Sequence, residues 1–109
     1  MSVIIKLKKA SDADAEEILF MQQAAFAPLL EKYKDYATNP AAENLERVRG
    51  RLTYTNTDTF FIVADNTKVG CIRIAHGYEV CKLKQILILP EFQGNGYAQS
   101  AIALAESLY

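Results

Sequence analysis

Hydrophobic positions along the chain follow two different periods, and each period predicts a type of element. Val3 to Leu7 alternates apolar and polar side chains, which predicts a first strand with one face in the core, ended by the two lysines that follow. Ser11 and Asp14 have the spacing of a capping box, which predicts a helix that starts near Asp12. Apolar residues recur at helical spacing in the segment that follows. We expect Pro28 to end or kink this helix close to Phe26.

A second helix and a β-hairpin are predicted for the middle of the chain. Asn39 and Pro40 are typical of an N-cap and a first helical residue, and the helix they open would bury Leu45, Val48 and Leu52. Its charged residues are interpreted as a solvated face: Glu43, Glu46, Arg47, Arg49 and Arg51. The apolar run 60–64, a turn over 65–68 and the run 69–76 then predict two antiparallel strands.

The stretch 85–98 predicts a buried strand that runs through a glycine turn into a helix. Ile86 to Leu89 is a continuous apolar run inside a fourth strand, Val80 to Leu89, and Pro90 ends the ladder because it has no N–H to donate. From Tyr97 the spacing becomes helical. The first four amides of a helix have no intrahelical partner, and the macrodipole adds about half a positive charge there. This turn is therefore an anion site that needs no basic side chain.

Composition limits the classes of function. The 109 residues are half hydrophobic, which indicates one domain (1–109) with a core of its own. Twelve basic and thirteen acidic residues nearly cancel, so the charge does not favour binding to nucleic acid or to an anionic membrane surface. The first apolar stretch is too short for a signal peptide or a membrane span. We expect a cytoplasmic protein.

The two cysteines are not expected to carry chemistry. Cys71 and Cys81 lack C-x-x-C spacing, and His76 is the only histidine, so no metal site is predicted. Both thiols are interpreted as buried, reduced and not catalytic.

A family resemblance rests on the glycine turn and its flanks. Gln93 to Ala98 fits a Q/R-x-x-G-x-G/A signature, and with the preceding strand and the following Ala-rich helix it resembles motif A of the GNAT (N-acetyltransferase) superfamily. The resemblance covers the whole chain, although only 86–98 is specific. A dinucleotide fingerprint is the nearest competitor, but its third glycine would fall at Gln99 and its acidic residue would lie beyond Tyr109.

The resemblance implies a fold and a cofactor. The fold would be α/β (α+β), a mainly antiparallel sheet in the order β-α-α-β-β-β-α, without the family's C-terminal strands and helix. The co-substrate would be acetyl-CoA, and the acceptor a small-molecule or peptide amine that attacks directly within a ternary complex. The implied pyrophosphate site comprises Gln93, Gly94, Asn95, Gly96, Tyr97 and Ala98. The implied backbone contacts to the pantetheine arm and the thioester come from Ile86, Leu87 and Ile88.

Catalytic residues are left unassigned. Many GNAT relatives carry a Glu on the fourth strand, but the segment 81–85 has no carboxylate. Glu31, Glu79 and Glu91 are alternatives, and none is chosen. Tyr33 and Tyr36 are candidate acceptor contacts, or else aromatic cover for the core edge. Neither Tyr97 nor Tyr109 is taken as the family's acidic tyrosine.

The end of the chain leads to one further expectation. The last helix has no C-cap signal, so we expect the N-terminal portion of a GNAT domain, with the strand Val80 to Leu89 left as an open edge. We expect this form to self-associate through that edge and to transfer acetyl groups weakly. Three functions remain in this order: an acetyltransferase, a catalytically silent acyl-CoA-binding or interaction module of the same fold, and an unrelated phosphate-binding domain.

Overall fold

The computed structural model describes residues 3–33, 44–77 and 80–108. In these ranges, the short 3-10 helices η1 (Asp12–Asp14) and η3 (Pro90–Phe92) accompany the main elements. The main elements are, in chain order, β1 (Ile5–Lys9), α1 (Ala15–Tyr33), α2 (Leu45–Leu52), β2 (Thr57–Ala64), β3 (Thr67–Gly77), β4 (Val80–Ile88) and α3 (Tyr97–Leu108). None of the helices in the described part of the chain is long and apolar enough to cross a membrane.

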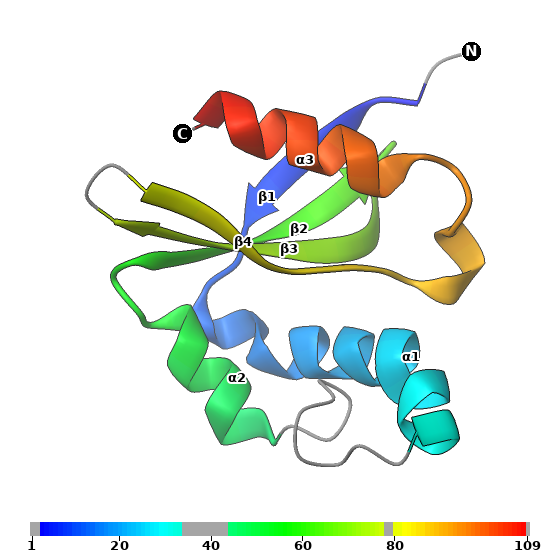
Figure 1. The fold of residues 1–109 in the computed structure, drawn as a ribbon, viewed down its shortest axis with the longest axis horizontal. Helices are drawn as coiled ribbons and strands as arrows, with labels where there is room; N and C mark the ends of the chain where they lie inside the picture. The colour runs from blue at the N-terminus through cyan, green and yellow to red at the C-terminus, as the bar shows by residue number, and fades with distance from the viewer. Residues whose placement is uncertain (1–2, 34–43, 78–79, 109) are drawn as a thin grey trace.

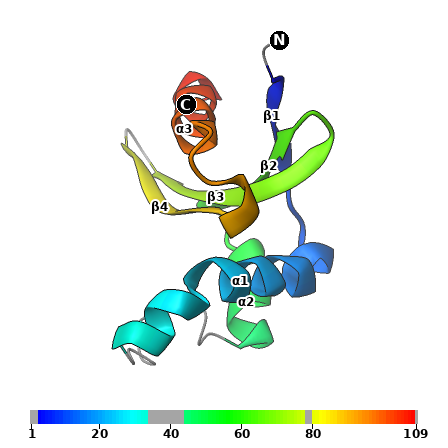
Figure 2. The ribbon, with the colours of Figure 1, turned by 90° about the vertical axis from the view of Figure 1, so that its right-hand side faces the viewer.

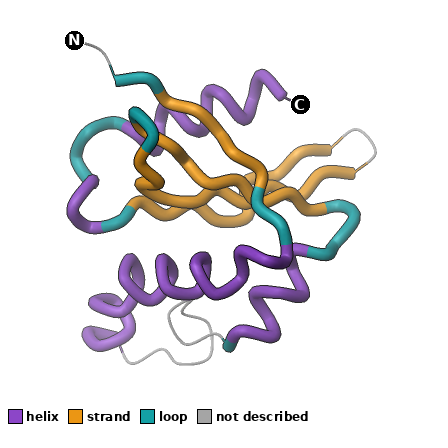
Figure 3. Tube along the Cα trace, turned by 180° about the vertical axis from the view of Figure 1, so that it is seen from behind, coloured by secondary structure: helices purple, strands orange, loops and turns teal. Residues whose placement is uncertain are grey.

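The described strands form one antiparallel sheet in the order β1-β2-β3-β4. Helices α1 and α2 cover one face of this sheet, and α3 covers the other (Figures 1 and 2). The connection from β4 through η3 to α3 loops out at one end of the sheet (Figure 3). The predicted α+β class, the antiparallel pairing and the order of elements are confirmed.

Two hydrophobic clusters hold these layers together. Neighbouring residues of β2 serve different layers, because successive strand side chains point to opposite faces: Phe61 packs toward α1 and α2, and Phe60 toward α3. The α1/α2 cluster also contains Ala15, Ile18, Met21, Val48, Cys71 and Leu87. The α3 cluster also contains Ile62, Val69, Ile72, Ile74, Ala101 and Ala105. Each large side chain buried in this way stabilises the fold by roughly 1.5–3 kcal/mol.

The first strand lies two residues later than predicted. It starts at Ile5, and the two lysines that were expected to end it are paired residues of the ladder, Lys8 with Phe61 and Lys9 with Phe60. Ile5 and Leu7 pack against the α3 cluster as predicted, but Val3 is 42% exposed. The partner strand sets the end of β1, and no local signal in β1 shows this.

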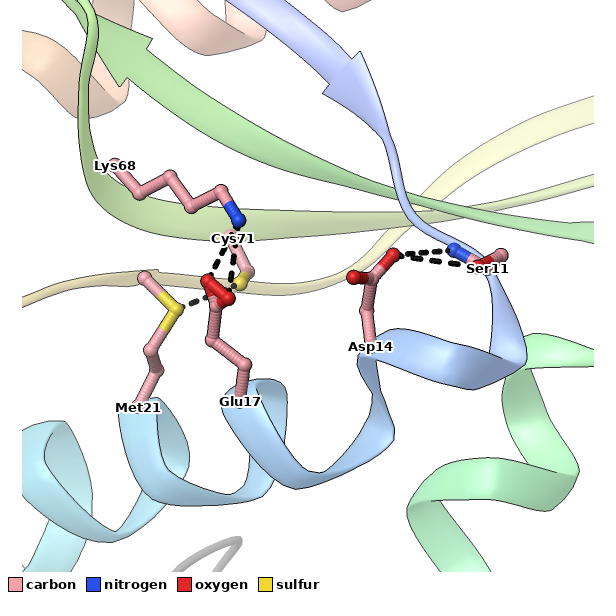
Figure 4. A network of polar contacts seen from close by, with 6 residues as sticks. All are labelled: Ser11, Asp14, Glu17, Met21, Lys68 and Cys71. Atoms are coloured by element: carbon pink, nitrogen blue, oxygen red, sulfur yellow. Dashed lines mark hydrogen bonds and ion pairs between the residues drawn. The ribbon is translucent and has the colours of Figure 1, made fainter.

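The first helix begins where predicted but does not end near Phe26. The Ser11 N–H donates to the Asp14 carboxylate at 2.9 Å, as a capping box requires, and η1 leads directly into α1 (Figure 4). The helix then continues through Pro28 to Tyr33, so of the two predicted outcomes, an end or a kink close to Phe26, the end is wrong. A proline inside a helix removes one hydrogen bond and crowds one carbonyl, a local penalty that the remaining turns of a long helix can offset.

The second helix begins at Leu45 in the described structure, with Asn44 as its N-cap. The Asn44 side chain accepts a hydrogen bond from the Arg47 N–H at 2.9 Å. The start predicted at Asn39 and Pro40 lies outside the described residues. Val48 is buried, and Leu45 and Leu52 pack against the α1/α2 cluster as predicted.

The hairpin and the last elements follow the prediction with longer strands. Asp65 and Asn66 have φ of 47° and 71°, which makes a two-residue turn, tighter than the one predicted. Strand β2 begins three residues before its predicted run and ends with it, and β3 extends on both sides of its run, because the ladder continues beyond the apolar residues. Strand β4 ends at Ile88, one residue early, and α3 begins at Tyr97 as predicted.

Candidate functional site

The glycine turn before α3 has a backbone that favours glycine. Gly94 and Gly96 have φ of 82° and 76°, in the left-handed region that other residues adopt at a penalty. A Cβ added at either position would meet no protein atom within 4 Å. The turn therefore has open space directly over its backbone.

Two side-chain amides fix the shape of this turn. The Gln93 Nε2 donates to the Ile88 carbonyl at 2.9 Å, which ties the turn back to the end of β4. The Asn95 Nδ2 donates to the Phe92 carbonyl at 2.9 Å. Gln93 thus holds the turn, and Asn95 braces it.

The first turn of α3 has amides without helical acceptors. The Ser100 N–H donates to the Gly96 carbonyl at 3.2 Å, so the amides that precede Ser100 in the helix have no carbonyl of their own helix to bind. The first turn of α3 carries no acidic side chain that would occupy these amides. The partial positive charge of the helix start is therefore directed at the space over the turn.

A depression of about 500 Å³ lies over this turn. Its lining residues are Ile88, Phe92, Gln93, Gly94, Gly96, Tyr97, Ala98 and Gln99. Six of the nine predicted cofactor residues are among them, and the other three lie close by. Asn95 braces the turn, Ile86 packs on the α3 cluster, and Leu87 lines a separate cavity. Phe92 and Gln99 were missed, although both are next to the motif in the sequence.

Some backbone amides of the edge strand β4 point away from β3. The Leu89 N–H donates to the Val69 carbonyl at 2.8 Å, and alternate residues of a strand direct their amides to opposite edges. The Leu87 amide therefore points toward β3, and those of Ile86 and Ile88 point away from it. Within the described chain β4 pairs with β3 alone, so these two amides face the open edge.

A second, small cavity lies between the sheet and helices α1 and α2. It measures about 10 Å³, room for about one water molecule, and two arginines from different elements border it. Arg51 was predicted to lie on a solvated helix face, which is wrong: it is half-buried and lines this cavity with Arg73. The sequence position of Arg51 could have predicted this, because it follows the buried Val48 by three residues, and residues three apart share a helix face.

Of the three acidic candidates, Glu91 is the one whose side chain lies within the described residues. Glu91 is exposed in η3. Glu79 and Tyr36 lie outside the described residues, as do the side chains of Glu31 and Tyr33. The described residues of β4 include no carboxylate.

The cysteines occupy different environments. Cys71 is buried, with its Sγ 3.5 Å from the Met21 Sδ (Figure 4). Burial raises the pKa of its thiol from 9.0 to about 12, and the Glu17 carboxylate adds to this. Cys81 was also expected to be buried, which is wrong: it is exposed, because it lies near the start of the edge strand β4. No three His, Cys, Asp or Glu side chains gather as a metal site in the described ranges.

The described chain thus combines an antiparallel sheet, helices on both of its faces and an open glycine turn between β4 and α3. The model of the acetyltransferase (GNAT) family matches residues 21–109. The chain belongs to this family and is an N-acetyltransferase by class. No curated protein sequence matches it significantly.

Solved structures share the fold at low sequence identity. An acetyltransferase from Thermus thermophilus is 21% identical, with a TM-score of 0.70 over 97% of this chain and 71% of its own. The PaiA N-acetyltransferase from Thermoplasma acidophilum, in complex with coenzyme A, is 18% identical, with a TM-score of 0.61 over 99% and 72%. A ribosomal-protein-alanine N-acetyltransferase from Brucella melitensis biovar Abortus 2308 is 18% identical, with a TM-score of 0.62 over 97% and 70%.

Proposed function

We propose that this chain binds acetyl-CoA and transfers its acetyl group to an amine by direct attack within a ternary complex. One observation carries the proposal: the open glycine turn at the start of α3 closely follows the edge strand β4 in the sequence, and the last residues of β4 have amides that point outward. The turn suits the pyrophosphate, and the strand suits the amide-rich arm that follows it in the cofactor.

The pyrophosphate would bind the backbone from Gly94 to Ala98. Its negative charge would meet the amides of the first turn of α3, and the absence of a Cβ at Gly94 and Gly96 lets phosphate oxygens approach the chain closely. Gln93 would act from behind, because its side-chain amide is engaged with the Ile88 carbonyl.

The pantetheine arm would add to the open edge of β4. The outward amides of Ile86 and Ile88 are suited to hydrogen bonds with the arm and with the thioester oxygen. Leu87, whose amide points toward β3, would contribute through its place in the strand. Its side chain is 4% exposed and anchors β4 to the α1/α2 cluster.

The reaction needs a neutral amine beside the thioester carbon. The amine nitrogen attacks that carbon, the tetrahedral oxyanion takes a hydrogen bond from a strand amide, and the C–S bond breaks. The amine loses one proton and the departing CoA thiolate gains one. Since the described part of β4 lacks a carboxylate, we assign no general base to this strand.

The acceptor class follows from related proteins. One structural neighbour is an aminoglycoside N-acetyltransferase in complex with CoA, and another is a ribosomal-protein-alanine N-acetyltransferase. We therefore propose a small-molecule or peptide amine as the acceptor. The two free thiols are compatible with the cytoplasmic location that we propose.

The same open edge supports self-association. The Gln85 to Ile88 segment of β4 carries no charge, and edges without charges are prone to pair with another strand. We propose that β4 pairs with a second copy of the chain when no CoA is bound.

The alternative function is a catalytically silent acyl-CoA-binding or interaction module. It shares the cofactor site with an active enzyme, so CoA affinity does not separate the two. Release of free CoA thiol that depends on an added amine does: the silent module would bind acetyl-CoA and release none.

Calorimetry of CoA binding tests the proposal. Gly96→Val and Gly96→Asn both place a side chain in the space over the turn, and Asn tolerates the left-handed backbone better than Val. Both should weaken CoA binding more than about tenfold, by obstructing the phosphates. Gly77→Ala, where an added Cβ meets nothing within 4 Å, is the control and should bind like the unaltered chain. Unchanged CoA affinity in Gly96→Val would remove the proposal.

A further inference from the structure

The small cavity beside α2 lies against the segment of β4 that would hold the thioester. Leu87 is part of its wall, and Leu87 is flanked by the two residues whose amides face the open edge. The cavity and the proposed acyl site thus share Leu87, and Gln85, which also lines the cavity, is next to Ile86 in the strand. A molecule at the mouth of this cavity would lie close to the acetyl group.

The mouth and the floor of the cavity differ in chemistry. The floor is buried and mainly apolar, with the polar side chains of Gln22 and Thr59 at 2% and 7% exposure. The mouth consists of half-buried residues, and we call three of them the arginine rim: Arg51, Arg73 and Gln85. Arg73 and Gln85 are cross-strand partners, so their side chains stand together on one face of the sheet.

Arg51 and Arg73 place two guanidinium groups at the rim. No acidic residue is among the described residues that line the cavity. Asp58, next to Thr59 in β2, points to the other face, where it pairs with Lys9 at 3.1 Å and His76 at 3.0 Å. Glu17 is engaged by Lys68 at 2.6 Å. The described lining of the mouth therefore holds two guanidinium groups and no carboxylate, and both arginines also have interactions within the protein.

We propose that the arginine rim selects amine acceptors that carry a carboxylate or a phosphate close to the amine. The inference rests on the proposed function, since the anion at the rim would direct the amine toward Ile86. A guanidinium has five N–H donors in a planar fork whose geometry matches a carboxylate or a phosphate. An arginine that binds a partner within the protein therefore still has other N–H donors for an anion. Because the cavity has room for only about one water molecule, the anion would bind at its mouth and not inside it.

A purely structural role for Arg51 would lead to a different result. Arg49 and Arg51 both lie in the last turn of α2, where positive charge favours the helix dipole. If that were the whole role of Arg51, replacing either arginine would have the same small effect on stability and none on the choice of acceptor. Arg49 is exposed and does not line the cavity, which makes it a matched control on the same helix.

The experiment uses the full chain saturated with CoA or acetyl-CoA and acceptors in pairs that differ only in charge. The small-molecule pairs are O-phosphoethanolamine with ethanolamine and β-alanine with β-alaninamide. The peptide pair is a tripeptide beginning with Asp and its counterpart beginning with Asn. Binding is followed by the amide shift of Gln85 in the ¹⁵N-labelled chain, and transfer by release of CoA thiol. The variants are Arg51→Gln, Arg73→Gln, Arg73→Lys and the control Arg49→Gln, each checked by thermal melting.

We expect the anionic member of each pair to bind more tightly and to react faster than the neutral member, by about tenfold or more. One hydrogen bond to a charged group has an effect of this size on affinity. Arg51→Gln and Arg73→Gln should each abolish most of this preference, and Arg73→Lys should recover part of it. Arg49→Gln should retain it, and CoA affinity should be equal in all variants. CoA binding without preference for anions, or rim variants that behave like Arg49→Gln, would overturn the inference alone. Absence of CoA binding to the unaltered chain would overturn the proposed function as well.

Discussion

At the scale of single residues, the environment of Cys71 separates a structural thiol from a catalytic one. The side chain is 5% exposed between α1 and the sheet, and burial raises the pKa of its thiol to about 12. A nucleophilic cysteine needs the thiolate near neutral pH, which this environment disfavours. Replacing Cys71 by Ala, or the exposed Cys81 by Ser, should leave acetyl transfer intact in a folded chain.

The same pKa gives a prediction for alkaline stability. In the folded chain the thiol ionises near pH 12, and in the unfolded chain near 9.0. Because the folded-state value is the higher one, its contribution is complete below pH 9 and is lost as the pH rises toward 12. The loss is at most about 1.4 kcal/mol per pH unit. Urea unfolding at pH 7.5, 9 and 10 should show unaltered chain and Cys71→Ala converging above pH 9. Parallel curves would contradict this.

Local backbone chemistry explains why the glycine turn could be predicted from sequence. Positive φ at Gly94 and Gly96 is a requirement that a glycine satisfies by itself, so the motif and the structure agree residue by residue. The arginine rim could not be found in this way. Arg73 comes from β3 and Arg51 from α2, and only their packing against the sheet brings them to one cavity.

At the scale of elements, the close approach of β3 and β4 depends on one glycine. A Cβ at Gly70 would lie 2.0 Å from the Leu87 carbonyl oxygen and 3.0 Å from its carbon, and neither backbone atom can move without displacing β4. Gly70→Ala should reduce the free energy of unfolding by roughly 3 kcal/mol, the upper end for overpacking. It should also weaken CoA binding, since β4 carries the outward amides.

Urea denaturation measures the first effect, with Gly77→Ala as the control. Gly77 lies in the same strand, but a Cβ there meets nothing within 4 Å, so this variant should unfold close to the unaltered chain. If the two variants were equally stable, the tight packing of β3 on β4 at Gly70 would have no energetic importance.

Element types were predictable, but several boundaries were not. Periodicity identified β1, but its pairing with β2 decided that Lys8 and Lys9 belong to the strand. Pro28 predicted an end or a kink of the helix, and the end is wrong, because α1 has enough turns to continue past this residue. In both cases an interaction from outside the local window prevailed.

At the scale of the whole molecule, the open edge of β4 links the two proposed interactions. A second copy of the chain and the pantetheine arm would both use the outward amides of Ile86 and Ile88. CoA should therefore shift the chain toward the monomer. Sedimentation velocity at two protein concentrations should show concentration-dependent association without CoA and its reversal with CoA. A monomer at every concentration, or association indifferent to CoA, would contradict the link.

The central claim is that backbone amides of the turn and of β4 hold acetyl-CoA. The most direct test is a ¹H–¹⁵N map of the 109-residue chain titrated with CoA. The account predicts the largest amide shifts at Gly94, Gly96, Tyr97 and Ala98, with further shifts at Ile86 and Ile88. A map without shifts in the turn, or with its largest shifts in another part of the molecule such as the groove between β1 and the end of α3, would contradict it.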